Sequence, residues 1–273
     1  MKNKKFCDIT DSYELVKYLK SAQRLSNINY LCKYMKLSSV LECLSTGMWL
    51  LNNPQNMNDL YEYRSFNDKE KWNHICFASF ITQSTESMAM WSMYAQPWEE
   101  GVMVSIPTIA VKKLINDTEF VIAADYNEKT GRYVPSKTEI PSKDILSLSR
   151  VAYYDGLYIT CTGRDDRNMH FGNPYKIAEL TGYIKDSAWD YEKEVRLRVD
   201  IPSQYNYNAA FIKLTEDYLN QISITSGPRF AGNVLTSIPS KYKAKISIDN
   251  SKFKEKLAWI PCDNCSKKQL INE

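Results

Sequence analysis

The sequence predicts a mixed α+β fold. Apolar and aromatic segments of strand length occur throughout the chain, and they are interspersed with helical patterns but without a strict strand–helix–strand alternation. The composition is 44 % hydrophobic and 25 % charged, which is typical of a globular protein. The chain has nine glycines and neither a GxGxxG motif nor a Walker loop, which argues against the Rossmann and P-loop routes to nucleotide binding. Because no convincing linker divides the chain, residues 1–273 are expected to form a single domain.

Local signals predict the individual elements in order. The capping box Asp11-x-x-Glu14 starts a helix over Asp11–Arg24, and a second box, Ser39-x-x-Glu42, starts a helix that ends at Gly47. Strands are predicted at Asn27–Tyr34, Met48–Leu51, His74–Thr82, Gly101–Ile106, Phe120–Ala124, Arg150–Tyr154, Lys193–Ile201, Gln221–Thr225 and Ala244–Ile248. Further helices are predicted at Glu86–Ala95, Pro174–Asp186 and Phe230–Ser237, and loops at Asn127–Asp144 and Thr162–Asn173.

Charge and cysteine usage indicate a cytoplasmic protein that does not span a membrane. No stretch reaches the roughly 18 apolar residues that a span requires, and the N-terminus has no apolar signal region. The seven cysteines are an odd, scattered set that suits reduced, buried thiols. The formal net charge is +3, so any site for a polyanion would have to be a local patch.

The segment from Trp189 to Arg198 is the most informative. If it is the start of a strand, Glu192, Glu194, Arg196 and Arg198 share one face. A solvated face with alternating ion pairs and a Glu-x-Glu site are equally compatible with this pattern. In a Glu-x-Glu site, one carboxylate orients a substrate hydroxyl while the other stabilises a developing positive charge.

Two earlier segments add aromatic and polar residues. The first runs from Tyr30 and Tyr34 through a helix to Asn58-Asp59-Leu60-Tyr61-Glu62. The second contains Ser79 within Cys76–Phe80, and then Trp91 and Tyr94 before Gly101. Taken separately, these residues are typical of a buried core.

In their order, the three segments resemble a bacterial family known only as a domain of unknown function, with the pattern Trp-x-Tyr-Glu-x-Glu-x-Arg at its end. The same layout is similar to divergent ADP-ribosyltransferases, particularly the DarT-like toxins that modify nucleic acid. This resemblance implies an ADP-ribosyltransferase-like split β-sheet core with flanking helices, and NAD as a substrate. It also implies a toxin or phage-defence effector, for which a cognate antitoxin and a chaperone would be partners.

The resemblance assigns roles to particular residues. It makes Glu194 the catalytic glutamate with Glu192 as its neighbour, Tyr30 or Tyr34 the first-strand position, and Ser79 with Tyr94 the middle position. Tyrosines and a cysteine stand where the superfamily has a first-strand histidine or arginine. Arg196 is grouped with the NAD-binding residues, beside Trp91.

The chemistry suits these residues. Breaking the nicotinamide–ribose bond passes through an oxocarbenium-like state that a carboxylate stabilises, and Tyr30, Tyr34 and Trp91 could stack on the cationic ring. We expect Glu194→Gln to abolish activity while leaving the fold intact. The alternatives are an NAD glycohydrolase that uses the same pocket, and a non-catalytic module that binds nucleic acid or protein.

Two further features bear on ligands. Cys262 and Cys265 are the only closely spaced cysteines, and without a second pair they make an incomplete zinc site, so no metal is expected. The C-terminal run Lys241–Lys256, with Tyr242 and Phe253, is more typical of a solvated face. Together with Arg196 and Arg198 it is also the candidate surface for a nucleic-acid acceptor, RNA before single-stranded DNA.

Overall fold

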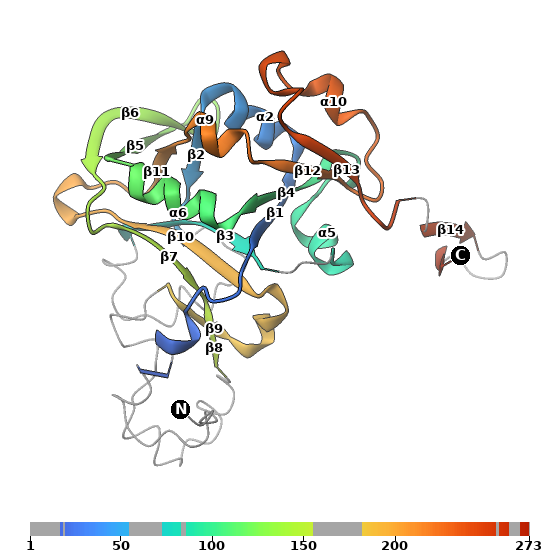
Figure 1. Ribbon diagram of the computed structural model, residues 1–273, viewed down its shortest axis with the longest axis horizontal. Coiled ribbons are helices and arrows are strands. Elements are labelled where there is room, and N and C mark those ends of the chain that lie inside the picture. Colours follow the sequence, from blue (N-terminus) through green and yellow to red (C-terminus); the bar gives the residue numbers. More distant parts are fainter. Residues whose placement is uncertain are drawn as a thin grey trace, which may run out of the picture. The chain divides into compact units, whose positions relative to one another are not determined.

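The computed structural model describes residues 17–18, 20–54, 73–82, 86–154, 182–254, 257–261 and 268–272 (Figure 1). It confirms a mixed α+β fold with several sheets and helices. The described residues divide into two compact units, the first within residues 1–28, 49–82 and 115–213, and the second within 29–48, 83–114 and 214–273. The single domain expected for residues 1–273 stays a prediction.

The first unit contains a row of antiparallel strands in the order β3-β10-β7 and a four-stranded sheet in the order β2-β11-β5-β6. Its strands are β2 (Met48–Leu51), β3 (Ile75–Ile81), β5 (Phe120–Asn127), β6 (Arg132–Pro141), β7 (Leu146–Arg150), β8 (Ala152–Tyr154), β9 (Ile184–Asp186), β10 (Glu194–Asp200) and β11 (Ala210–Lys213). Its 3₁₀ helices are Ser187–Glu192 and Ser203–Tyr205. β8 and β9 form a separate parallel pair.

Strand β10 is buried on both faces, so the solvated face, one of the two interpretations of its alternating pattern, is wrong. Every residue from Glu194 to Val199 is buried, and Glu194, Arg196 and Arg198 alternate with the apolar Val195, Leu197 and Val199. In the antiparallel register, Arg196 lies opposite Ser79 of β3 and Ser149 of β7. A polar face is therefore enclosed within the protein.

The second unit contains strands in the order β13-β12-β4-β1. Its strands are β1 (Tyr30–Lys36), β4 (Gly101–Pro107), β12 (Ser223–Ser226), β13 (Ser247–Asn250), β14 (Leu257–Pro261) and β15 (Lys268–Asn272). Its helices are α2 (Leu37–Thr46), α5 (Met88–Tyr94), α6 (Thr108–Asp117, of which 108–114 belong to this unit), α9 (Glu216–Leu219) and α10 (Val234–Ser237), with 3₁₀ helices at Trp98–Glu100 and Ser240–Tyr242.

Several predicted boundaries need correction. Helix α2 begins at Leu37, directly after β1, and its N-cap residue Lys36 makes no side-chain cap, so the Ser39-x-x-Glu42 capping box is wrong. The predicted loop Asn127–Asp144 contains strand β6. The end of the predicted helix Pro174–Asp186 is a turn followed by β9, and its residues 174–181 lie outside the described residues. No helix within the described residues has the length and apolar character needed to cross a membrane.

Candidate functional site: a buried carboxylate–cation cluster

The two glutamates of the Glu-x-Glu motif come from different elements. Glu192 ends the 3₁₀ helix Ser187–Glu192, which begins where the Asp186 side chain accepts a hydrogen bond from the Ala188 N–H (2.9 Å). Lys193 then adopts a left-handed conformation, with φ 46° and ψ 48°, and the chain enters β10 at Glu194. The expectation that both glutamates lie on one strand face is therefore wrong, because the left-handed residue interrupts the alternation.

Glu194 is held by a two-point ion pair within its own strand. Arg196 donates from Nε to Oε1 (2.8 Å) and from Nη2 to Oε2 (3.1 Å). The Arg196 guanidinium also donates from Nη1 to the Gly182 carbonyl (2.8 Å) and lies 4.2 Å from the centre of the Phe77 ring. Such bidentate geometry fixes both the position and the orientation of a carboxylate.

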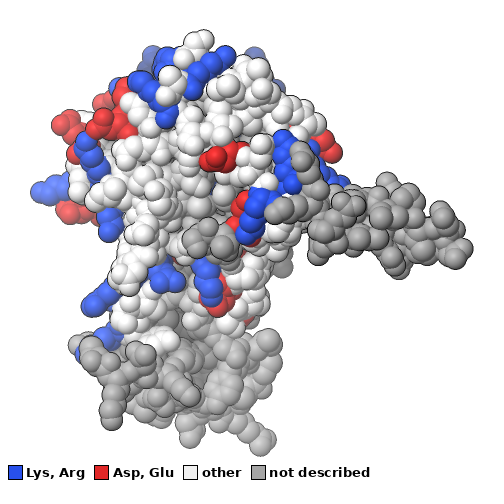
Figure 2. Space-filling model, turned by 45° about the vertical axis from the view of Figure 1, so that its right-hand side comes forward, with Lys and Arg blue, Asp and Glu red and all other residues white. Residues whose placement is uncertain are grey.

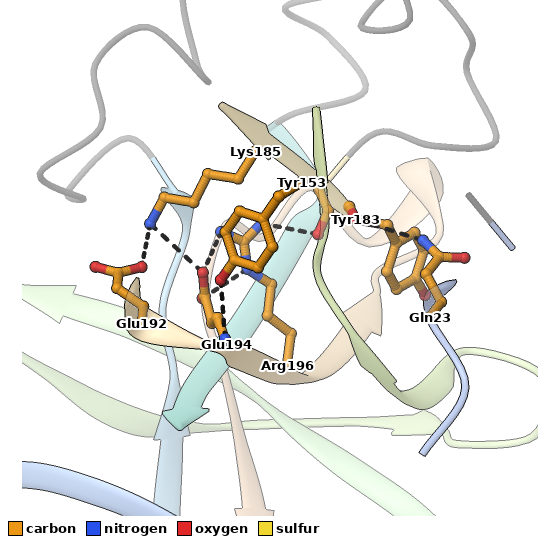
Figure 3. Close-up of polar contacts among 8 residues, drawn as sticks. Gln23, Tyr153, Tyr183, Lys185, Glu192, Glu194 and Arg196 are labelled. Carbon is orange, nitrogen blue, oxygen red and sulfur yellow. Dashed lines mark hydrogen bonds and ion pairs between the residues drawn. The ribbon is translucent and has the colours of Figure 1, made fainter. Parts of the chain in front are cut away.

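Lys185 joins the two carboxylates (Figure 3). Its Nζ lies 2.6 Å from Oε2 of Glu192 and 3.5 Å from Oε2 of Glu194. The same ammonium lies 4.5 Å from the centre of the Trp189 ring, within the range of a cation–π contact. Although Glu192 and Glu194 belong to different elements, they meet at this one cation.

The cluster is almost wholly removed from solvent. Lys185, Glu192, Glu194 and Arg196 are 4 %, 3 %, 2 % and 0 % exposed. Their formal charges cancel, two negative against two positive. Cancellation matters here, because a single uncompensated charge at this depth costs several kcal/mol.

Glu194 is ionised at neutral pH. Burial alone would raise the pKa of its carboxyl, but the charges of Arg196 and Lys185 and hydrogen bonds from Arg196 and Ser79 outweigh it and lower the pKa to about 2. In the strand register Ser79 lies opposite Arg196, two residues along β10 from Glu194, and its hydrogen bond contributes to the lowered pKa.

Tyr153 of β8 adds an aromatic group beside the cluster. Its hydroxyl accepts a hydrogen bond from the Glu194 backbone N–H (2.9 Å), and Figure 3 shows its ring standing beside that carboxylate. Burial raises the pKa of the Tyr153 phenol, and the charges of Glu194 and Glu192 raise it further. The phenol thus keeps its proton at neutral pH.

The predicted aromatic residues form a second cluster, in the second unit. Tyr34 and Trp91 contact each other edge to face, with ring centres 4.7 Å apart, and both are buried. The Tyr34 hydroxyl accepts from the Ser87 N–H (3.1 Å), and burial raises the pKa of Tyr34 to about 12. Trp91 donates to Glu86 through its indole N–H (3.1 Å).

The remaining predicted residues are distributed over both units. Tyr30 begins β1 with 57 % of its surface exposed, and Tyr94 ends α5 half-buried. Glu194, Glu192, Ser79 and Arg196 belong to the first unit, whereas Tyr30, Tyr34, Trp91 and Tyr94 belong to the second. The structure brings together Glu192, Glu194, Ser79 and Arg196, and separately Tyr34 with Trp91.

Some predicted features lie outside the described residues, and others are corrected. The Asn58–Glu62 motif and the pair Cys262 and Cys265 are outside the part of the chain that the structure describes. Within that part, no three His, Cys, Asp or Glu side chains gather as metal ligands would. Arg196 and Arg198 are buried, so they cannot belong to an acceptor surface.

Sequence reasoning missed Lys185, Tyr153 and Gly182. Lys185 and Gly182 lie in a segment whose pattern predicts a helix, and Tyr153 is one aromatic residue of a predicted strand. Their proximity to Glu194 depends on the pairing of β8 with β9, where Tyr153 lies opposite Lys185. No spacing in the sequence signals that pairing.

Residues 90–197, less than half of the chain, match the model of a family described as "Protein of unknown function (DUF2971)". The matched region runs from within α5 into β10 and includes all four charged residues of the cluster. It supports the predicted resemblance to a family of unknown function. No curated protein and no solved structure matches the chain.

Proposed function

We propose that the chain is an ADP-ribosyltransferase that cleaves NAD and transfers ADP-ribose to a nucleic acid, with RNA as the first expected acceptor and single-stranded DNA as the second. The proposal includes an ADP-ribosyltransferase-like split-sheet core and a role as a toxin or phage-defence effector. It rests on the resemblance of the Trp189–Arg198 segment to divergent ADP-ribosyltransferases and on one structural observation. That observation is an ionised Glu194 held in a fixed orientation, with Glu192 sharing the same cation.

In this proposal, each carboxylate has one task. As the bond between nicotinamide and ribose breaks, nicotinamide leaves with the bonding electron pair and positive charge develops on the ribose. A nucleophilic atom of the acceptor then forms the new bond to that ribose carbon and gives up its proton. Glu194, whose position Arg196 fixes, stabilises that charge. Glu192 orients a substrate hydroxyl.

The burial of the same cluster favours a second candidate function. Glu194 is 2 % exposed and its charge is compensated, which suits an ion-pair network that only stabilises the fold. In that case the chain is a non-catalytic binding module. The two candidates differ in whether NAD is consumed.

The acceptor surface proposed for a nucleic acid is the lysine run at 241–245. Lys241, Lys243 and Lys245 are exposed, whereas Tyr242 is 1 % exposed and therefore does not offer a stacking face. Lys252 lies 5.1 Å from the centre of the half-buried Phe253 ring. Blue and red groups are mixed across the face shown in Figure 2, so that face does not carry a general positive field.

The deciding experiment incubates the chain with NAD labelled on its adenylate part and separate pools of RNA, DNA and cell protein. We expect label in RNA and none with Glu194→Gln. Loss of NAD without label in any pool would indicate a glycohydrolase, and NAD left intact in every pool would favour the binding module. Because Glu194 is buried, the folded fraction of the variant must be measured in the same preparation.

A further inference from the structure

The Lys185 ammonium lies among side chains of the kinds that bind organic cations. Carboxylates of Glu192 and Glu194 face it from 2.6 Å and 3.5 Å, and the Trp189 ring lies 4.5 Å away. Carboxylates combined with an aromatic face are how proteins bind ammonium and pyridinium groups. Here the cation is one that the chain itself supplies.

Glu194 has a charged partner besides Lys185, which lies on β9 directly before the 3₁₀ helix of Trp189 and Glu192. Trp189 and Glu192 belong to the 3₁₀ helix and Glu194 to β10, and these elements are joined through Lys193. Lys185 approaches from the short strand β9, while Glu194 keeps its own partner, Arg196. Withdrawal of the ammonium would take one positive charge from beside the two carboxylates.

We propose that Trp189, Glu192 and Glu194 form a subsite for an organic cation, and that Lys185 fills it as an autoinhibitory contact. The charged nicotinamide end of NAD is the cation that the proposed function supplies, so this part of the inference rests on that function. NAD displaces Lys185 in order to reach Glu194. The 2 % exposure of Glu194 then describes the self-occupied state of the site.

The test is chemical rescue of Lys185→Ala, measured as thermal stability without NAD. Removal of the ammonium deletes a buried positive charge that lies 2.6 Å from the Glu192 carboxylate, and we expect the Tm to fall by about 10 °C. n-Propylammonium reproduces the atoms that the substitution deletes, and at a tenfold excess over its Kd it should restore about 3 °C. Neutral n-propanol should restore nothing.

The ring-methylated nicotinamide cation is the second probe, with neutral nicotinamide as its control. We expect the cation to raise the Tm of Lys185→Ala but not that of the wild type, in which Lys185 fills the subsite. The matched control variant is Lys113→Ala, which breaks a surface pair with Asp217 whose side chains are 56 % and 65 % exposed. That variant should lose little stability and respond to neither cation.

Two outcomes would overturn the proposal. One is a folded Lys185→Ala chain whose Tm does not rise with n-propylammonium, and the other is an equal rise with n-propanol. If Lys185→Ala does not fold alone, the readout becomes the yield of folded protein on refolding with each compound, which only the cations should increase. The double variant Lys185→Ala/Glu192→Gln removes one charge of each sign from the cluster, so it should fold without a cation. Its Tm should rise several-fold less with n-propylammonium than that of Lys185→Ala.

The rescue and the NAD experiment can fail independently. Rescue by cations in a chain that labels no acceptor and leaves NAD intact would keep the subsite and end the proposed function. Label in RNA without rescue would keep the transferase and end the autoinhibitory role of Lys185.

Discussion

Replacement of Glu194 by glutamine should destabilise the protein strongly, contrary to the expectation from sequence that the fold stays intact. Glutamine preserves the shape of the side chain but removes the charge that Arg196 and Lys185 compensate. Arg196 and Lys185 would then each lose a charged partner. The structure therefore predicts a cost to folding as well as any cost to chemistry.

The magnitude follows from the pKa of Glu194. Its lowering from 4.5 to about 2 in the folded protein corresponds to about 3 kcal/mol of stability at neutral pH. Removing one member of a buried pair costs about 3–5 kcal/mol in general, so the two routes agree. Against a total stability of about 5–15 kcal/mol, this loss is large.

The assay is urea unfolding of the wild type and Glu194→Gln, followed by tryptophan fluorescence. At about pH 7 the unfolding midpoint should fall by about 1 M urea. Because the folded pKa is depressed, the contribution of Glu194 is complete above about pH 4.5 and is lost as the pH falls towards 2. The gap between the two proteins should therefore narrow at about pH 3.5.

The matched control is Asp190→Asn, which makes the same chemical change at a half-exposed pair. Asp190 Oδ2 lies 2.5 Å from Lys193 Nζ, and their side chains are 50 % and 40 % exposed. This variant should lose less than about 1 kcal/mol. The reasoning is refuted if Glu194→Gln is as stable as Asp190→Asn at about pH 7, or if its deficit does not change on acidification.

Two further predictions concern the second unit. Gly227→Ala should lower the free energy of unfolding by about 2 kcal/mol in the same urea assay. The reason is that an added Cβ would lie 2.8 Å from the Gly101 carbonyl oxygen and 3.2 Å from the Trp91 ring. A variant as stable as the wild type would contradict this packing. The charge-reversed variant replaces the exposed lysines of the proposed acceptor surface, Lys241, Lys243 and Lys245, by glutamate. Labelling of RNA by the wild type should fall steeply with salt and be lost in this variant, whereas salt-independent labelling of a protein band would defeat the nucleic-acid acceptor.

Where a single residue type determines the backbone conformation, the sequence alone predicts the local structure. Gly47 ends α2 in the left-handed conformation, with φ 67°, and its N–H donates to the Cys43 carbonyl (2.9 Å), as the pattern predicts. Only glycine takes that conformation readily. The start of the same helix carries no such signal, because the chain passes from β1 into α2 without a polar cap.

Strand β6 shows how tertiary context overrides a local signal. Its prolines, at 135 and 141, favour a loop in the sequence. In the structure β6 is the last strand in the order β2-β11-β5-β6, so it pairs with β5 alone. An edge strand tolerates proline because one side of its backbone needs no partner.

The candidate site was predictable only in part, for a similar reason. Glu192, Glu194 and Arg196 are close in the sequence, and their spacing predicts that they lie near one another, as they do in the structure. Their burial was not predictable, because it follows from pairing with β3 and β7. Lys185 joins them through β9, a strand of three residues whose pattern carries no signal of its own.

The two carboxylates are held in ways that suit different roles. Arg196 and Glu194 are two residues apart on one strand, so their bidentate contact lies within β10 itself. The contact between Lys185 and Glu192 joins β9 to the 3₁₀ helix and depends on how these short elements pack. In the proposed displacement of Lys185, Glu194 would therefore still have Arg196 as its charged partner, whereas Glu192 would lose the ammonium 2.6 Å from its carboxylate. This difference favours Glu194 as the group that stabilises a cation and Glu192 as its helper.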